Sequence, residues 1–515
     1  MRVIKAVLAL LLAAAVAIVV ARLLFPLPSI EGRPAEAALP AVTDGVLGRM
    51  AGEGSSANPG KSGVVPIAGG HDAIASRLVM SAVATHSIDA QYYIWHDDTS
   101  GRLLLRALYE ASKRGVRVRL LLDDNGVPGL DRTMATLAAQ PNFEVRLFNP
   151  STVRRPKMLG YTFDFFRMNR RMHNKSFIVD GVAAIVGGRN VGNEYFKVGD
   201  ESYYFDLDVL GTGPVVQDTS AAFDRYWNSA SVFAAESILD MSAANLETFL
   251  AETDEAAARP EAAEFITPDA PIYKRLRSGA LGLEWVDVKL VVDDPSKGEG
   301  KATKDQLMIA QLAKVIGPVS KGLDLVSAYF VPGKAGTDYF DGLARAGAQV
   351  RILTNALETT DVAMVHAGYA KYRRGLLEGG VKLYELRPVE GAPDGDAELN
   401  VIGSSGASLH AKTFSVDDDR IFIGSFNFDP RSALLNCEMG FLIDSPAMAQ
   451  TISGAFDNRI PEDAYTVSLT PEGKLSWTAS RPGEAPQSFS SDPHSGVVKR
   501  ALVVVLGWLP IEWML

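Results

Sequence analysis

The chain has 515 residues, of which 47% are hydrophobic and 22% charged, a balance that suits two folded domains of about 150–200 residues each. Its formal net charge of −10 disfavours a dedicated nucleic-acid binder, because such proteins present a basic surface to the phosphate backbone. The sequence contains one cysteine, Cys437, and this excludes an intrachain disulfide and a cysteine-based metal site.

Residues 1–27 predict a membrane segment. An apolar run extends from residue 6 to residue 21, and a helix of about 20 residues spans the ~30 Å of a bilayer core. Arg2 and Lys5 precede the run, so the positive-inside rule puts the N-terminus in the cytoplasm and the remaining chain across the membrane. A cleaved signal peptide is the alternative interpretation. We expect an uncleaved anchor because the run is long for a signal core.

Residues 28–66 are expected to form a linker, which is flexible in the Gly/Ser-rich stretch 52–63. After it, two parts of the chain repeat one order of elements: strand, loop, amphipathic helix, glycine, strand. The first copy starts at Ile88 and the second at Leu323. We therefore predict two repeats, at 67–250 and 307–460, joined by a connector at 251–306.

The repeats predict an α/β fold. Alternating strands and helices indicate βαβ units, so we expect two pseudo-symmetric repeats with mixed, mostly parallel sheets that face each other around one active site. Residues 461–515 are predicted to contain a hairpin, a tether and an apolar segment at 497–515. Trp508 and Trp513 suit the headgroup region of a membrane. The alternative is a helix that docks on the protein's own core.

One stretch differs from the acidic balance of the chain. Residues 153–171 hold six basic residues and one acid, interleaved with aromatic residues, and they lead into the motif at His173. We expect the stretch to bind anionic lipid headgroups, and we expect Arg167, Arg170 and Arg171 to orient a second lipid. Single-stranded nucleic acid and an ordinary surface loop are the alternatives.

The most specific signal is a duplicated motif, His-x-Lys-x-x-x-x-Asp. The first copy is His173, Lys175 and Asp180, and the second copy, 237 positions later, is His410, Lys412 and Asp417. A Gly-rich turn that ends in asparagine follows each copy at the same distance, and places Asn190 and Asn427. Two such copies are unlikely to arise by chance, although a single His-x-Lys pattern is common.

These residue types suit cleavage of a phosphodiester. Side chains alternate along a strand, so the histidine and the lysine of each copy point the same way. One imidazole attacks phosphorus and the other protonates the leaving alkoxide, while the lysines and the asparagines stabilise the negative charge of the transition state. We expect Asp180 and Asp417 to support the turns rather than to carry protons. This chemistry requires no metal and no cofactor.

With these motifs the chain resembles the phospholipase D superfamily over about residues 73–460. Within it the chain is similar to the bacterial cardiolipin synthases of the C type. The residues that carry this likeness are QYYIWHDDTSGRLLL from Gln91, RLLLDDNGVPGLD from Arg119, NRRMHNKSFIVDG from Asn169 and VHAGYAKYRRGLLEGGVKLYELRP from Val365.

The resemblance implies transfer of a phosphatidyl group through a phosphatidyl-histidine intermediate to a headgroup hydroxyl of another phospholipid. The charges that flank the apolar run predict that this occurs at the periplasmic side of a bacterial inner membrane. The resemblance also implies His173 as the nucleophile and His410 as the acid and base, roles that the near symmetry of the repeats makes reversible. A catalytic histidine needs a carboxylate on its second ring nitrogen. Glu438 stands where the superfamily has such an acid, and Asp206 is the candidate in the first half, with Asp208 as the alternative.

Three function classes follow. The first is a phosphatidyltransferase that makes cardiolipin from phosphatidylglycerol and a second phospholipid, with phosphatidylethanolamine as one candidate. The second is a phospholipase D that transfers the same intermediate to water. The third is a nuclease with the same motifs, which the acidic net charge and the anchor disfavour. The sequence identifies no accessory membrane protein.

Overall fold

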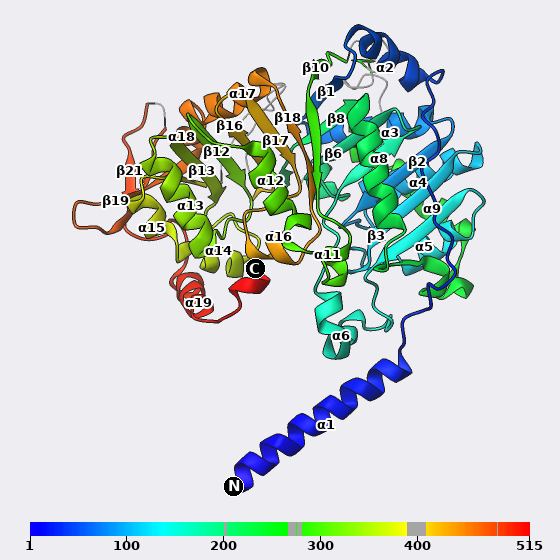
Figure 1. Ribbon diagram of the computed structural model, residues 1–515, viewed down its shortest axis with the longest axis horizontal. Helices are drawn as coiled ribbons and strands as arrows, with labels where there is room; N and C mark the ends of the chain where they lie inside the picture. Colours follow the sequence, from blue (N-terminus) through cyan, green and yellow to red (C-terminus); the bar gives the residue numbers. More distant parts are fainter. Residues whose placement is uncertain (200–202, 266–273, 276–280, 389–407, 482) are drawn as a thin grey trace.

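The computed structural model describes residues 1–199, 203–265, 274–275, 281–388, 408–481 and 483–515. The body contains two large mixed sheets side by side, with helices packed on both, and the helix α1 (Arg2–Leu24) projects away from it (Figure 1). The predicted α/β fold with two repeats is confirmed, because each sheet contains the strands of one repeat.

The first sheet has the strand order β10-β1-β8-β6-β5-β2-β3-β4-β9. Its strands are β10 (Glu284–Val286), β1 (Ser62–Ile67), β8 (Asp208–Thr212), β6 (Ala183–Gly187), β5 (Ser176–Val179), β2 (Ser87–Tyr92), β3 (Arg117–Asp123), β4 (Phe143–Phe148) and β9 (Val232–Ala234). Its helices are α2 (Val46–Ala57), α3 (Gly70–Val83), α4 (Thr99–Lys113), α5 (Asp131–Ala138), α6 (Tyr161–Met168), α7 (Asn193–Phe196), α8 (Pro214–Trp227) and α9 (Leu246–Ala257).

The second sheet has the order β11-β18-β17-β16-β12-β13-β14-β19-β20-β21. Its strands are β11 (Val288–Val292), β18 (Met439–Ile443), β17 (Arg420–Gly424), β16 (Lys412–Val416), β12 (Gly322–Ser327), β13 (Gln349–Asn355), β14 (Lys382–Leu386), β19 (Ala464–Leu469), β20 (Leu475–Ala479) and β21 (Gln487–Phe489). Its helices are α11 (Ser296–Glu299), α12 (Met308–Ile316), α13 (Gly333–Arg345), α14 (Ala363–Ala370), α15 (Arg373–Glu378), α16 (Pro430–Leu434), α17 (Pro446–Asp457), α18 (Ile460–Asp463) and α19 (Val497–Gly507).

The sheets are mixed, as predicted, but the expectation that they are mostly parallel is wrong. Parallel pairing in these two sheets joins β2 to β3 to β4 and β12 to β13 to β14, and the other described pairings are antiparallel. The reason lies in the motif strands. β5 and β6 form a tight hairpin, as do β16 and β17, and strands that are joined by so short a turn must run antiparallel.

Among the described residues, three hydrophobic cores support the two sheets, and a small fourth cluster lies under α19. One lies between the first sheet and α3, α4, α5 and α9, and another covers the outer face of the second sheet under α12 and α13. The third core lies between the two halves and combines α8 side chains, such as Phe223 and Trp227, with Ile452 and Phe456 of α17. The two repeats therefore pack through a continuous apolar layer.

The stretch expected to be a flexible linker is folded. Residues 52–63 include the end of α2 and the start of β1, and the ring of Trp285 packs directly on them. A Cβ atom added to Gly54 would lie 2.2 Å from Cζ2 of Trp285, and one added to Gly63 would lie 2.9 Å from it. The glycines thus allow close packing, which composition alone does not distinguish from flexibility.

The connector between the repeats is also part of the sheets. β10 pairs with β1 at the edge of the first sheet, and β11 pairs with β18 at the edge of the second. One residue, Asp287, separates these two strands. The chain therefore crosses from one sheet to the other in extended conformation, and this ties the two edges together.

The helix α1 is long and apolar enough to cross a membrane, and none of its residues is buried. Its exposed apolar surface has no partner in the body along most of its length (Figure 1). This agrees with the prediction of a single N-terminal membrane anchor.

The motif aspartates lock corresponding turns in the two halves. Asp180 accepts hydrogen bonds from the backbone amides of residues 85–87 at 2.8–3.0 Å, just where β2 begins. Asp417 accepts from the amides of residues 320–322 at 2.7–3.0 Å, where β12 begins. Both aspartates have positive φ, at 53° and 57°, which Asp tolerates better than most residues. Each carboxylate therefore fixes a motif hairpin to the central strand of its sheet.

Replacing Asp417 by Asn keeps the size and the tolerance of positive φ but removes the charge that three amides share. We expect the free energy of unfolding to fall by about 1–3 kcal/mol. Urea unfolding followed by far-UV circular dichroism measures this. Asp419→Asn, at an exposed position two residues away, is the matched control and should change stability by less than about 0.5 kcal/mol. Equal stability of both variants would contradict the structural role.

Candidate active site

The segments that carry the two motif histidines pair with the opposite half of the molecule. The His173 amide donates to the Cys437 carbonyl at 2.8 Å, and the Cys437 amide donates to Arg171 at 2.8 Å. In the same way, β15 (Ser408–Leu409) pairs in parallel with β7 (Tyr204–Phe205), and the His410 amide donates to Phe205 at 2.8 Å. Two short parallel bridges between the halves therefore bring the histidines into one site.

These bridges place a carboxylate from each half against the histidine of the other. Glu438 Oε2 lies 2.8 Å from Nδ1 of His173, and Asp206 Oδ2 lies 2.5 Å from Nδ1 of His410. All four side chains are buried or nearly so. A carboxylate on Nδ1 sets the tautomer and leaves Nε2 as the ring nitrogen available to a substrate.

The geometry distinguishes Asp206 from its alternative. Asp208 pairs with the guanidinium of Arg77 at 2.9 Å, and both groups are fully buried, so Asp208 is a structural ion pair in the first sheet. Asp206 is the acid that reaches a histidine. The sequence placed one acid in each half, but it carried no signal that each acid serves the opposite half.

The motif lysines lie beside the histidines. Lys175 Nζ donates to the His173 carbonyl at 2.7 Å, and Lys412 Nζ lies 2.9 Å from Nδ1 of His410. Burial holds the pKa of Lys175 well below its ordinary value and lowers the pKa of Lys412. The two lysines are therefore buried beside two histidines and two carboxylates, and an anionic phosphate next to them would favour their charged form.

The two histidine–carboxylate pairs differ electrostatically. Burial raises the pKa of Glu438 to about 7, against the opposing charge of Lys175. Burial also acts to raise the pKa of Asp206, but the charges of Lys412 and His410 outweigh it and hold this pKa below its ordinary value. Asp206 is thus ionised at neutral pH, whereas Glu438 titrates there.

A one-residue difference between the repeats accompanies this asymmetry. Ser425, in the second Gly-rich turn, donates its hydroxyl to Glu438 Oε2 at 2.5 Å. The matching position of the first turn is Gly188, where an added Cβ would lie 2.1 Å from Asp206 Oδ1. Asp206 can therefore approach only because this residue has no side chain.

The histidine rings lie against tyrosines that the sequence analysis did not identify. Tyr93 lies 5.0 Å from His173 between ring centroids, and Tyr195 and Tyr204 each lie 5.2 Å from His410. Tyr93 follows the central strand of its sheet, so its position after a buried strand was the one available signal. Tyr195 and Tyr204 come from α7 and β7, and no pattern in the sequence connects them to His410.

The motif asparagines hold corresponding loops. Asn190 Oδ1 accepts from the Ile94 amide at 3.2 Å, and Asn427 Oδ1 accepts from the Tyr329 amide at 3.4 Å. Both loops leave the carboxyl end of a central strand, β2 or β12. Each asparagine therefore has a structural role in addition to the substrate contact that we predicted for it, since its Nδ2 group is a separate donor.

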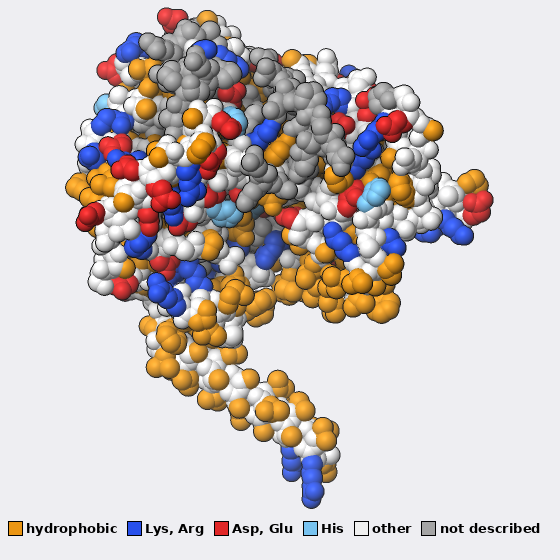
Figure 2. All heavy atoms as spheres, turned by 180° about the vertical axis from the view of Figure 1, so that it is seen from behind, with side chains coloured by type: hydrophobic (Ala, Val, Ile, Leu, Met, Phe, Trp, Pro, Cys, Tyr) orange, Lys and Arg blue, Asp and Glu red, His pale blue; other side chains and the backbone are white. Residues whose placement is uncertain are grey.

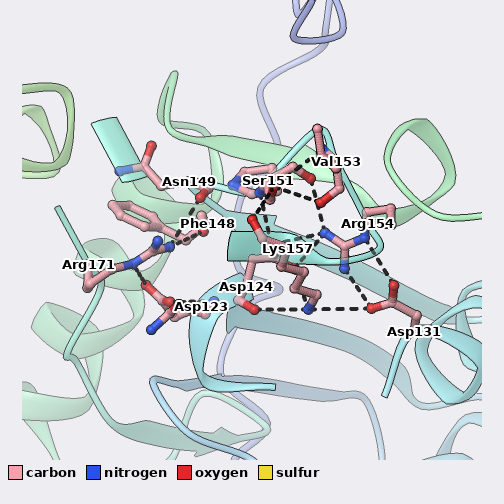
Figure 3. A network of polar contacts seen from close by, with 12 residues as sticks. Asp123, Asp124, Asp131, Phe148, Asn149, Ser151, Val153, Arg154, Lys157 and Arg171 are labelled. Carbon is pink, nitrogen blue, oxygen red and sulfur yellow. Dashed lines mark hydrogen bonds and ion pairs between the residues drawn. The ribbon is translucent and has the colours of Figure 1, made fainter. Parts of the chain in front are cut away.

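The basic stretch 153–171 is not a free cationic surface, so the expectation that its cations bind headgroups is wrong for the members that Figure 3 shows. Arg171 is buried and donates to Asp123 Oδ2 at 3.0 Å. Arg154 and Lys157 both donate to Asp124, at 2.9 and 3.2 Å. Asp123 ends β3 and Asp124 follows it, and no pattern in the sequence connects these two acids to the cations. The ion pairs fix the loop that leads into His173.

Two further clusters gather potential metal ligands, and no metal is assigned to either. His96 lies 3.0 Å from Glu194, with Asp98 nearby. The Asp98 carboxylate is the N-cap of α4 and already accepts a hydrogen bond from the Gly101 amide. His366 and Asp492 form the second cluster with Glu385, and the guanidinium of Arg373 occupies its centre, 2.7 Å from Asp492. Internal ion pairs account for the geometry of both clusters.

Comparisons with known proteins agree with the duplicated site. The family model described as "Cardiolipin synthase, PLD-like domain" matches residues 79–227 and 312–460, once within each predicted repeat. The chain therefore belongs to this family of phospholipase D-like proteins, as the motifs predicted. Both matched segments contain a complete histidine-lysine-aspartate motif.

Individual proteins are similar to this chain over most of its length. Cardiolipin synthase C of Escherichia coli (strain K12) is 45% identical over 464 residues, which are 89% of this chain and 98% of that protein. Cardiolipin synthase B of Shigella flexneri is 24% identical over 394 residues, or 76% of this chain and 79% of that protein. Among solved structures, phosphatidylserine synthase of Haemophilus influenzae has the same fold, with a TM-score of 0.52, 14% identity and coverage of 81% of this chain and 91% of that one.

The pKa of Glu438 predicts the pH dependence of the site. Below about pH 7 the protonated carboxyl donates to Nδ1 of His173, which leaves the proton on Nε2 and blocks attack by that nitrogen. Turnover should therefore fall about tenfold per pH unit below 7. In Glu438→Gln this limb should disappear, because an amide does not titrate, and the remaining activity should be lower and flat. An unchanged acid limb in this variant would assign it to another group.

The same shift has a consequence for stability. A carboxyl whose pKa is raised by folding binds its proton more tightly in the folded state than in the unfolded state. The contribution of Glu438 to stability is therefore present below its ordinary pKa of 4.5 and is lost as the pH rises through about 7.

Proposed function

We propose that the protein is a phosphatidyltransferase that makes cardiolipin from phosphatidylglycerol and a second phospholipid, through a phosphatidyl-histidine intermediate. The observation that carries this proposal is the reciprocal pair His173–Glu438 and His410–Asp206, which gives one buried site two oriented imidazoles. Likeness to cardiolipin synthase C over 98% of that protein supports the choice of substrates.

In the proposed first step, Nε2 of His173 attacks the phosphorus of the donor lipid. The N–P bond forms as the bond from phosphorus to the headgroup oxygen breaks, and His410 gives its proton to that oxygen. The released alcohol is glycerol if the donor is phosphatidylglycerol and ethanolamine if it is phosphatidylethanolamine. Lys175 and Lys412, with Asn190 and Asn427, stabilise the charge on the non-bridging oxygens.

In the second step, His410 takes the proton of a headgroup hydroxyl of phosphatidylglycerol. The new P–O bond forms as the N–P bond breaks, and this yields cardiolipin and restores both histidines. Water at roughly 55 M competes for the same intermediate, so transfer requires an acceptor that is held in line at a higher effective concentration. The buried setting of both histidines supports transfer because it limits the access of bulk water.

The electrostatic asymmetry supports the assignment of the two histidines. Burial and the charge of Lys175 hold the pKa of His173 well below its ordinary value, so its imidazole is neutral and nucleophilic. Burial and Lys412 lower the pKa of His410, while the ionised Asp206 acts to raise it. His410 is therefore the ring better suited to carry a proton to the leaving group.

We place the catalytic halves on the periplasmic side of a bacterial inner membrane. The support is the position of Arg2 and Lys5 before an apolar helix, since cationic flanks stay in the cytoplasm. Cleavage of the body by protease added to spheroplasts measures this orientation, and full protection of the body would contradict it.

The function is tested with the purified full chain in vesicles. Phosphatidylglycerol alone, and phosphatidylglycerol with headgroup-labelled phosphatidylethanolamine, are supplied, and the lipids and released alcohols are identified by mass spectrometry. We expect cardiolipin and one released alcohol per molecule of cardiolipin in at least one mixture. Phosphatidic acid as the main product in both mixtures would establish the hydrolase alternative instead.

A donor with an activated leaving group separates the two histidines. Phosphatidyl-p-nitrophenol needs no proton on its leaving oxygen, so His410→Ala should still release about one equivalent of nitrophenol in a burst and retain a covalent adduct on His173. His173→Ala should give neither burst nor adduct. With phosphatidylglycerol as donor, both variants should lose at least about 10³-fold in turnover. An adduct on His410 in the His173 variant would exchange the two roles.

A further inference from the structure

The C-terminal helix α19 exposes most of its apolar surface. One side of it packs on α14 through Val503, which is buried against Ala367 and Leu357. The opposite side shows Val498, which is 84% exposed, together with Leu502 and Val505, at helical spacing. Trp508, at the end of the helix, is 81% exposed. A helix that is held by one face and apolar on the other is unusual for a surface in contact with water.

A second apolar surface lies on α6 and on η2 (Lys157–Gly160), the short helical turn before it. Phe166 is 68% exposed and Met158 is 69% exposed, and Leu159 and Phe165 lie beside them on the same segment. Figure 2 shows apolar side chains gathered along the lower edge of the body, on the side from which α1 projects. The two surfaces thus lie at the same end of the molecule as the anchor.

The anchor is attached directly to α6. The rings of Phe25 and Phe163 stack with their centroids 6.1 Å apart, and Nε of Arg22 donates to the Phe163 carbonyl at 2.8 Å. A helix that crosses the membrane reaches the headgroup region at its last turn, which here is the turn that contacts α6. The apolar side chains of α6 therefore lie at the level of the membrane surface.

The helix α16 connects α6 to the C-terminal segment. The Arg431 guanidinium donates to Asn169 Oδ1, at the end of α6, at 2.7 Å. The amide of the same residue donates to the carbonyl of Leu515 at 2.7 Å. Leu434 of α16 is 55% exposed and lies between the two surfaces in this chain of contacts. The two apolar surfaces are therefore held in one fixed arrangement.

The charge of the C-terminal segment suits an anionic bilayer. Residues 497–515 contain two basic residues and one acid, in a chain whose net charge is −10. The cations Arg154, Lys157 and Arg171 are paired with acids, so η2 and α6 contribute apolar side chains rather than charge. Basic side chains beside apolar ones, with Trp508 and Trp513 present, are the composition of a segment in the membrane interface.

We propose that the exposed apolar side chains of η2, α6, α16 and α19 form one bilayer-contact platform, which lies in the headgroup region of the membrane that α1 crosses. The occupant is the lipid bilayer, and the platform fixes the height and tilt of the body above it. α6 ends five residues before His173, and α16 begins three residues after Asn427, so the platform is continuous with both motifs. This inference rests on the proposed membrane setting but not on the identity of the acceptor lipid.

The depth of the C-terminal tryptophans tests the platform directly. The full chain is reconstituted in vesicles of phosphatidylglycerol and phosphatidylcholine that carry a nitroxide at either the headgroup or the chain end. We expect the shallow label to quench the fluorescence of Trp508 and Trp513, and the quenched fraction to fall in Trp508→Phe/Trp513→Phe. Trp95, Trp227 and Trp477 are buried, and Trp285 is half-buried on β10, at the opposite end of the body (Figure 1). These four tryptophans form the background that remains in the double variant. This readout does not depend on activity.

Activity provides the second readout. The variant Val498→Asp/Leu502→Asp/Val505→Asp should turn over bilayer lipid at least fivefold more slowly, because charges on this face oppose its insertion. Turnover of a monomeric short-chain phosphatidylglycerol, which reaches the site from water, should be unchanged. Val505→Asp and Val46→Asp form a matched pair, because Val46 is similarly exposed but lies on α2, at the opposite end of the body (Figure 1). Val46→Asp should have no effect with either lipid.

Other outcomes would overturn the platform. Equal losses with bilayer and short-chain lipids would mean that the aspartates disturb the fold or the chemistry. If the tryptophans are not quenched and light scattering shows that the chain dimerises at high protein concentration, this face is an interface between two copies of the chain.

Discussion

The site depends on an exchange of carboxylates between the two halves. Glu438 of the second half holds His173 of the first, and Asp206 of the first half holds His410 of the second. Neither half contains an oriented histidine by itself. The apolar layer between the halves, in which α8 meets α17, is therefore a condition for a competent site as well as for stability. The consecutive strands β10 and β11, through which the chain crosses from one sheet to the other, reinforce the same contact.

Burial of two lysines, two histidines and two carboxylates in one pocket is costly unless the charges compensate each other. The compensation here is uneven. Asp206 keeps its charge beside Lys412, whereas Glu438 is held by burial at a pKa of about 7. A serine at position 425 in one turn and a glycine at position 188 in the other accompany this difference, although the hydrogen bond from Ser425 by itself lowers the pKa of Glu438. The two halves thus differ in proton affinity, as the proposed roles of a nucleophile and a proton carrier require.

The segment 153–171, which leads into His173, has a structural function that its composition does not indicate. Arg154, Lys157 and Arg171 are bound to Asp123 and Asp124 at the end of β3, and this fixes the loop, whereas Phe165 and Phe166 are exposed. The segment that leads into His173 is therefore held by ion pairs. Composition is also a poor guide at residues 52–63, where the glycines allow Trp285 to pack closely and do not make the segment flexible.

The sequence by itself determined the two motifs, the two βαβ units, the apolar N-terminal helix and the family. Each of these is a local pattern, set by residue type and spacing within a few tens of residues. Such patterns can be recognised in the sequence alone. It also supplied Glu438 and Asp206 as candidates, but not their partners. The tertiary structure alone decided that the acids cross between the halves, that Tyr195 and Tyr204 flank His410, and that Arg154, Lys157 and Arg171 are paired with acids. These contacts join residues that are far apart in the chain, as His173 and Glu438 are, and their geometry arises only when the two sheets pack together.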